Sequence, residues 1–255
     1  MRVFIGILSF NSRERTDKLV GAVRPIVSDA VDWMVEFGRD LKCIVEVFDN
    51  GSDGNEIPSS ATSRSTTNLQ MTGGMNALLR LARSTSPNYV WLLTNDILFE
   101  ECNVNPILKL TSFLEMHRDV GIVHPALMKE PVPNFAYPWM VYREDVFHDN
   151  TIKMIDFVVP MFTKEALDVL GWEFDPRFTY GWGIDYDMCI RVREAGLKIA
   201  VDYMCLIDHL TSVTYDEGKH PDFKNRQEYY AKAMECMEKG MTEKYGKNWR
   251  RRVYE

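Results

Sequence analysis

The sequence predicts an α/β fold in which a mainly parallel sheet is flanked by helices. Short runs rich in β-branched and aromatic residues alternate with longer segments of helical spacing, which is typical of strands joined by crossover helices. Apolar residues at 75, 78, 79 and 82 follow the i, i+3, i+4, i+7 spacing of one buried helix face. Polar residues also follow the first three predicted strands, at the carboxyl ends where open parallel sheets bind ligands.

The elements are predicted in order along the chain. Strands are expected over 3–8, 44–48, 89–93 and 120–124, with helices over 16–38, 74–84 and 106–117 between them. Several prolines and aromatic residues in 128–149 indicate an irregular loop or a short hairpin. A strand over 155–162, helices from Lys164 and near Asp185, and a strand over 199–207 follow. We expect one domain over 1–213, with a C-terminal helical extension over 214–255 packed on it.

The composition is that of an ordinary globular protein and disfavours several classes. Of 255 residues, 45% are hydrophobic and 26% are charged, and the formal net charge is −7. No segment approaches the roughly 18 consecutive apolar residues of a membrane span. The acidic balance disfavours nonspecific binding to nucleic acid or anionic lipid. We therefore predict no integral membrane association.

The N-terminus and the cysteines bear on the location of the protein. Charged residues closely follow the first apolar run, so that run is expected to be a strand and not a signal peptide. The five cysteines are widely spaced and form no CxxC pair, so neither a disulfide framework nor a cysteine zinc site is indicated. We therefore expect a cytoplasmic protein.

Two features mark the C-terminal region. Basic residues crowd the last dozen positions around Tyr245 and Trp249, which indicates a solvated terminal helix. Contact with a phosphate-bearing partner or a membrane surface is the alternative. The methionine- and tyrosine-rich segment after residue 221 is expected to pack on the domain or to form a self-association surface, so a homodimer is one of the predicted states.

Residues at the strand ends are candidate ligands for a small molecule and a metal ion. Asp96 follows a run predicted to be buried, where its carboxylate is suited to a hard divalent cation, although an Asx turn is the alternative. Asp49 and Asn50 begin the segment DNGSDG, which also has ordinary turn chemistry. Gly74 and Asn76 are expected at the start of a helix whose free amides favour anions.

Two residues in the second half of the chain complete this set. Asp185 follows the segment TYGWGI, where it is either a complement to a helix N-terminus or a general base. His209 follows an apolar strand and is either a structural hydrogen-bonding residue or a metal ligand. Several aromatic side chains could stack on sugar rings or bases, or pack in the core. These are Phe135, Tyr137, Trp139, Trp172, Tyr180 and Trp182.

The order of the motifs resembles the GT-A glycosyltransferases, in particular the large inverting family 2. The segments are SFNSRE, VFDNGSDG, TGGMNALLRLA, YVWLLTNDI, GWEFDPRFTYGWGIDYDMCIRVREAGLKI and IDHLTS, and they cover about residues 1–213. The resemblance implies a metal-dependent hexosyl- or pentosyltransferase that uses Mn or Mg. The implied donor is a nucleotide-diphosphate sugar, with a UDP-sugar expected first. The acceptor is expected to be a glycan, a glycoconjugate or a modified nucleic-acid base.

The resemblance also implies roles for individual residues. Asp185 matches the family's catalytic base, although Ile184 replaces the first acid of its acidic pair. Asp96 matches the metal-binding last acid of the DxD motif, with Thr94 in place of the first acid, and His209 matches the late metal-ligating histidine. The implied nucleotide-sugar-binding residues are Ser9, Phe10, Asn11, Arg13, Asp49, Asn50, Gly74, Asn76, Asn95, Trp182 and Gly183.

Other functions fit parts of the sequence. A sugar nucleotidylyltransferase also uses a nucleotide-binding sheet with acidic metal ligands, but SFNSRE lacks the glycines expected after the first strand. A catalytically inactive nucleotide- or glycan-binding protein is a second alternative, which the presence of Asp96, Asp185 and His209 disfavours. A Rossmann dehydrogenase is disfavoured because no GxGxxG follows the first strand.

Overall fold

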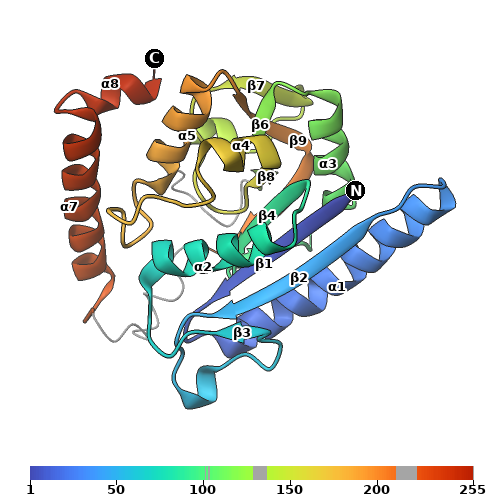
Figure 1. The fold of residues 1–255 in the computed structure, drawn as a ribbon, viewed down its shortest axis with the longest axis horizontal. Coiled ribbons are helices and arrows are strands. Elements are labelled where there is room, and N and C mark those ends of the chain that lie inside the picture. Colours follow the sequence, from blue (N-terminus) through green and yellow to red (C-terminus); the bar gives the residue numbers. More distant parts are fainter. Residues whose placement is uncertain (101, 103, 129–136, 211–222, 255) are drawn as a thin grey trace.

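A computed structural model describes the chain except residues 101, 103, 129–136, 211–222 and 255 (Figure 1). The predicted α/β class is confirmed. The elements are β1 (Arg2–Ser9), α1 (Arg13–Glu36), β2 (Lys42–Asp49), η1 (Gly54–Glu56), β3 (Ser63–Arg64), α2 (Gln70–Ser84), β4 (Tyr89–Thr94), β5 (Ile97–Leu98), α3 (Pro106–Met116), β6 (Val120–Leu127), η2 (Pro138–Met140), β7 (His148–Ile152), β8 (Met161–Thr163), α4 (Lys164–Val169), α5 (Ile184–Glu194), β9 (Lys198–His209), α7 (Arg226–Tyr245) and α8 (Trp249–Tyr254).

A nine-stranded sheet forms the centre of the part of the chain that is described. Its strand order is β3-β2-β1-β4-β8-β6-β9-β5, and β7 pairs with β9. Strands β1 to β4 are parallel to one another, whereas β8 is antiparallel to both β4 and β6. Ser9 is in register with Asp49, and Leu8 with Thr94. The carboxyl ends of β1, β2 and β4 therefore lie at one edge of the sheet, as predicted for the ligand site.

Helices pack closely on the parallel half of the sheet. Helix α1 contacts β1 and β2, and α2 also contacts both strands. A Cβ added at Gly74 of α2 would lie 2.6 Å from Leu8 Cδ1 of β1. Only a residue without a side chain allows the helix to approach the strand so closely. The strand itself is buried from Val3 to Ser9, which is typical of a parallel strand covered on both faces.

The predicted strand over 155–162 is wrong for most of its length, because only Met161–Thr163 forms a strand. The preceding residues are buried, and their carbonyl groups accept hydrogen bonds from β4, with Leu92 N donating to Pro160 O at 3.2 Å. A regular ladder does not form, because Pro160 has no N–H and Val159 N donates to His124 Nε2 at 3.2 Å. The apolar sequence pattern over 155–162 therefore predicted burial of this segment but not its conformation.

Other boundaries also differ from the prediction. Helix α2 begins at Gln70 and not near Gly74, because Asn50 Oδ1 accepts from Leu69 N at 3.1 Å and Asn68 Oδ1 accepts from Gln70 N at 2.8 Å. Gly74 and Asn76 therefore lie inside the helix and beyond its first turn. The free N–H groups expected at the helix start belong to earlier residues. The predicted loop over 128–149 falls partly outside the described residues, and its remaining part contains η2 and the start of β7.

The C-terminal helices pack on the domain. Helix α8 packs on the domain through Trp249, which is 2% exposed, whereas its three arginines Arg250, Arg251 and Arg252 are exposed to solvent, as expected for a basic terminal helix. Lys244 at the end of α7 forms ion pairs with Asp175 at 2.8 Å and with Asp187 of α5 at 2.5 Å. These contacts fix the extension to the segment around α5. None of the helices in the described part of the chain has the length and apolarity to cross a membrane.

Candidate active site

The loop after β1 is fixed to the loop after β2 by hydrogen bonds. Asn11 has a left-handed backbone (φ 45), and its N donates to Ser52 Oγ at 2.8 Å. Its side-chain Oδ1 accepts from Asp53 N at 2.9 Å. Ser9 Oγ lies 2.7 Å from Thr16 Oγ1 and so connects the strand end to α1. These contacts give two of the predicted ligand loops one rigid arrangement.

Asp49 lies at the end of β2 and is completely buried. Its Oδ1 accepts from Ser52 N at 3.2 Å, and its Oδ2 lies 2.9 Å from Arg64 Nε. The side chain of Arg64 is 47% exposed. A ligand that approaches this edge would therefore meet Arg64 before Asp49, and the sequence analysis did not identify Arg64. Phe10 is partly exposed and Arg13 is exposed in the same region.

Asn50 and Asn76 are both bound to backbone. Asn50 Nδ2 donates to Gln70 O at 3.0 Å and so anchors the start of α2. Asn76 Nδ2 donates to Phe174 O at 2.9 Å, and its Oδ1 accepts from Phe174 N at 2.8 Å. Asn76 therefore fixes the segment before α5, and its assignment to nucleotide binding stays a prediction.

Asp96 and His209 are brought together by the pairing of β5 with β9. Ile97 pairs with His209, and Asp96 Oδ2 lies 3.3 Å from His209 Nε2. Burial raises the pKa of Asp96, but His209 and Thr94 together hold this pKa below its usual value. Burial lowers the pKa of His209, but the charges of Asp96 and Asp156 together raise it above its usual value. Asn95 beside them donates from Nδ2 to Thr16 Oγ1 at 3.2 Å.

The Asp96–His209 pair has the chemistry of part of a metal site. Asp96 Oδ1 and His209 Nδ1 are buried and have no hydrogen-bond partner among the described residues. A carboxylate oxygen and an imidazole nitrogen are suitable ligands for Mn, and Mg is often held by one or two carboxylates together with substrate phosphates. Within the described ranges, no group of three or more His, Cys, Asp or Glu is placed to hold an ion. The pair therefore fits a cation whose other ligands come from a substrate.

Asp185 lies in the first turn of α5 and is 8% exposed. Tyr137 Oη donates to its Oδ2 at 3.0 Å, and Gly183 N donates to its Oδ1 at 3.1 Å. Burial raises the pKa of Asp185 to about 7, with a further contribution from the charge of Asp156. A carboxylate with this pKa accepts and releases a proton near neutral pH, which suits a general base.

Asp156 interacts electrostatically both with the Asp96–His209 pair and with Asp185. The sequence analysis did not identify it. It lies just before β8, and Phe157 N donates to its Oδ1 at 2.8 Å. Burial raises the pKa of Asp156, while the nearby charge of His209 lowers it. Its charge also acts on Asp185 and Asp96. The sequence feature that could have identified Asp156 is its position as a single acid within a predicted apolar strand. An acidic residue in such a place is rarely buried without a partner or a function.

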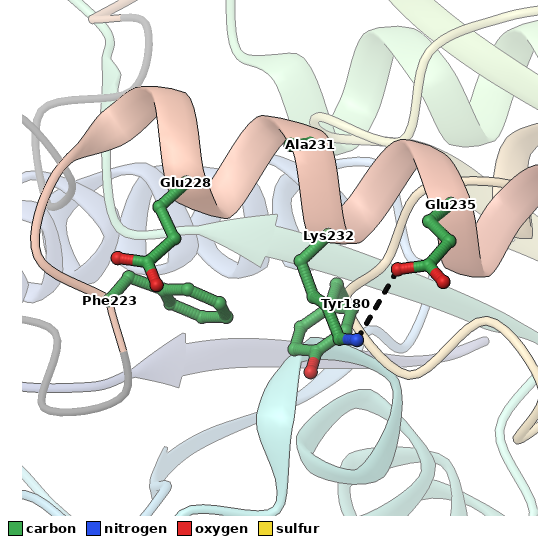
Figure 2. Close-up of a pocket in the computed structure, with 6 residues that line it drawn as sticks. All are labelled: Tyr180, Phe223, Glu228, Ala231, Lys232 and Glu235. Atoms are coloured by element: carbon green, nitrogen blue, oxygen red, sulfur yellow. Dashed lines mark hydrogen bonds and ion pairs between the residues drawn. The ribbon is translucent and has the colours of Figure 1, made fainter.

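The loop before α5 carries Trp182 and Gly183. Gly183 has φ 97, which an ordinary side chain rarely adopts, and this conformation directs its N–H to Asp185. The ring of Trp182 lies 5.1 Å from that of Tyr230 in α7. A pocket of about 480 Å³ lies beside this loop and is lined by Tyr180, Phe223, Glu228, Ala231, Lys232 and Glu235 (Figure 2). Tyr180 is one of the aromatic residues predicted to stack on a sugar or a base, but the acidic cluster does not line this pocket.

No family model matches the chain. Two curated relatives are the uncharacterized protein Mb1552 of Mycobacterium bovis and the uncharacterized protein Rv1525 of Mycobacterium tuberculosis. Each is 24% identical over 169 residues, which is 64% of this chain. The match spans 62% of the length of each relative.

Three solved structures have a similar fold. GalNAc-T7 with UDP, GalNAc and Mn²⁺ has a TM-score of 0.58 and 9% identity, over 82% of this chain and 43% of that one. Mannosyltransferase PcManGT from Pyrobaculum calidifontis, in complex with GDP-Man and Mn²⁺, has a TM-score of 0.55 and 14% identity, over 92% of this chain and 64% of that one. S. aureus TarS 1–349 has a TM-score of 0.56 and 12% identity, over 95% of this chain and 66% of that one. At these identities the likeness shows the fold, which is GT-A-like as predicted.

Proposed function

We propose that the chain is a nucleotide-sugar glycosyltransferase whose active centre is formed by Asp96, His209 and Asp185. Two observations support this proposal: the 3.3 Å contact between Asp96 and His209, and the electrostatic interactions of Asp156 with Asp96, His209 and Asp185, all within a GT-A-like fold. The fold alone does not define a reaction, because one fold supports many functions. The proposal therefore depends on this cluster of side chains.

The donor is proposed to lie along the carboxyl ends of β1, β2 and β4. Two of the structural neighbours were solved with UDP or GDP-Man, which supports a nucleotide-diphosphate donor. Asp49 and the adjacent Arg64 offer an acceptor and donors for hydrogen bonds to a base or ribose. A UDP-sugar is our first candidate, and a glycan, a glycoconjugate or a modified base remains the proposed acceptor.

Asp96 and His209 are proposed to hold a divalent cation. A bound cation would supply electrostatic stabilisation of the negative charge that develops on the departing diphosphate. The two neighbours solved with Mn²⁺ support this choice of cofactor. Asp96 and His209 are the residues that would hold the metal, and Asp96 Oδ1 is a buried oxygen without a hydrogen-bond partner in the described structure.

Asp185 is proposed to act as the general base in an inverting transfer. The bond between the sugar carbon and the diphosphate oxygen breaks, and the acceptor oxygen bonds to that carbon from the opposite face. The acceptor proton passes to Asp185, and the electron pair of the broken bond leaves with the diphosphate. The pKa of about 7 supports this role, since the carboxylate is then both available and basic near neutral pH.

Donor binding and transfer can be tested separately. Thermal shift with UDP, GDP, dTDP and CMP sugars, with and without Mn²⁺, should identify a donor that stabilises the chain. Asp96→Ala should abolish the metal-dependent part of that shift, whereas Asp119→Ala, at an exposed ion pair with Lys198, should retain it. Undiminished stabilisation of Asp96→Ala would remove Asp96 from the site.

The catalytic role of Asp185 needs a measurement of product. Asp185→Asn should bind the donor normally but lose at least about 100-fold in transfer, because removing a general base typically costs 10²–10⁴-fold. Near-normal turnover would reject Asp185 as the base. Donor binding without transfer by the wild-type chain to any acceptor or to water would favour the inactive binding protein.

A further inference from the structure

We propose that Tyr137 is a positioning residue that holds the Asp185 carboxylate in one orientation for the acceptor. This inference rests on the proposed function, because it gives Asp185 the role of general base. Tyr137 Oη lies 3.0 Å from Asp185 Oδ2, and Gly183 N lies 3.1 Å from Asp185 Oδ1. Each carboxylate oxygen therefore receives one fixed hydrogen bond, and the carboxylate cannot rotate without losing both.

Tyr137 is itself held in place by neighbouring residues. Its side chain is largely buried, and its ring stacks on that of Trp139 with centroids 5.3 Å apart. Trp139 Nε1 donates to Met154 O at 2.6 Å, and Tyr203 Oη of β9 donates to Trp139 O. The ring of Tyr137 is thus fixed through Trp139 to two separate parts of the domain. This is the support that a positioned catalytic group requires.

The direction of the hydrogen bond is also determined. Burial and the charge of Asp185 raise the pKa of Tyr137 far above its usual value, so its hydroxyl stays protonated and donates. A carboxylate has about four lone-pair sites, and Tyr137 and Gly183 use one on each oxygen. The backbone of Tyr186 also interacts with this carboxylate, and a lone pair that these three groups leave is the one we assign to the proton of an acceptor hydroxyl.

The same hydrogen bond opposes the other groups that face Asp185. Asp156, in the segment before β8, raises the pKa of Asp185, whereas the hydrogen bond from Tyr137 lowers it. Tyr186 and Cys189, on α5 itself, are the further titratable groups whose electrostatic interactions include Asp185. Removing the Tyr137 hydroxyl should therefore raise the pKa of the base and free its orientation.

The first test does not depend on activity. The full chain labelled with ¹³C at aspartate carboxyl groups is titrated by NMR, with Asp185→Asn used to assign the signal. Tyr137→Phe should raise the Asp185 midpoint by about one pH unit, the size expected for a lost hydrogen bond to a charged group. The matched control is Tyr245→Phe, which removes a 2.7 Å hydrogen bond to Asp187 on the same helix. This control should leave the Asp185 midpoint unchanged.

The second test measures catalysis with water as the acceptor. Release of the nucleoside diphosphate from UDP-GalNAc and GDP-mannose is followed against pH for the wild type and both variants. Tyr137→Phe should lower kcat roughly tenfold, with the donor KM within about twofold, and should move the acid limb upward. Tyr245→Phe should retain the wild-type kcat and profile.

The outcomes separate the two proposals. An unchanged midpoint, or an unchanged kcat and acid limb, in Tyr137→Phe would overturn the positioning role while the proposed function stands. A wild-type chain that transfers sugar from neither these donors nor the donor found by thermal shift, to water or to any candidate acceptor, would overturn the proposed function, and the role of Tyr137 in catalysis with it. The NMR midpoint would still report whether the hydrogen bond forms.

Discussion

Gly183→Ala should destabilise the domain strongly, because the substitution combines backbone strain with a steric clash. Gly183 has φ 97, a conformation that costs an ordinary residue about 1–2 kcal/mol. A Cβ at this position would lie 2.6 Å from Phe178 Cδ1 and 2.9 Å from Phe178 Cε1. Phe178 is fully buried, so its ring cannot move away without disturbing the core. Overpacking of this kind costs about 1–3 kcal/mol.

The two contributions give an expected loss of about 3 kcal/mol in the free energy of unfolding. Urea unfolding followed by circular dichroism measures this loss. The matched control is Gly196→Ala, which has φ 84 but no atom within 4 Å of an added Cβ, so it should lose only about 1 kcal/mol. Equal losses in the two variants would refute the steric part of the reasoning. A loss below about 0.5 kcal/mol for Gly183→Ala would refute both parts.

Three further predictions concern buried charges. Because burial raises the pKa of Asp185 from 3.8 to about 7, its ionised form lowers stability above pH 7, and the cost disappears as pH falls towards 4. Asp185→Asn should therefore gain about 4 kcal/mol at pH 8 and lose this advantage at pH 4, measured by urea unfolding at each pH. Lys244→Met removes the 2.5 Å ion-pair partner of Asp187, which keeps its contacts with Tyr245 and Arg191, and should cost about 2 kcal/mol. Lys232→Met, at an exposed ion pair, should cost under about 0.5 kcal/mol. Asp156→Asn should lower the pKa of Asp185, visible as a lower NMR midpoint; an unchanged midpoint would show that the two carboxylates do not interact.

Much of the fold was predictable because the strands of the parallel half are nearly continuous apolar runs. The runs that became β1, β4 and β6 are largely buried in the sheet, and β2 is buried over its last three residues. Such strands differ clearly from helices in length and flanking residues. The segment over 155–162 is equally apolar but has a different conformation, because a proline and a buried histidine interrupt its ladder. Local pattern indicates burial reliably, whereas hydrogen-bond partners depend on distant residues.

The candidate site was predictable only where position along a strand determines location. The expectation that polar residues meet at the strand ends is confirmed for Asp49 and for the segment before Asp96, since parallel strands in register place their ends together. Arg64 and Tyr137 could not be assigned in this way. Each is brought to the site by a loop or a short strand, and its contact with Asp49 or Asp185 depends on the folded structure.

The three-residue strand β8 has a consequence for the order in which the molecule assembles. It is hydrogen-bonded to β4 on one side and to β6 on the other, so in the described sheet it joins the parallel strands β1 to β4 to the strands around β6 and β9. A nascent chain that ends before residue 161 leaves the edges of β4 and β6 unpaired and open to association with other chains. The sheet is therefore completed only after β8 has been synthesised, and β9, which pairs with β6, follows later still.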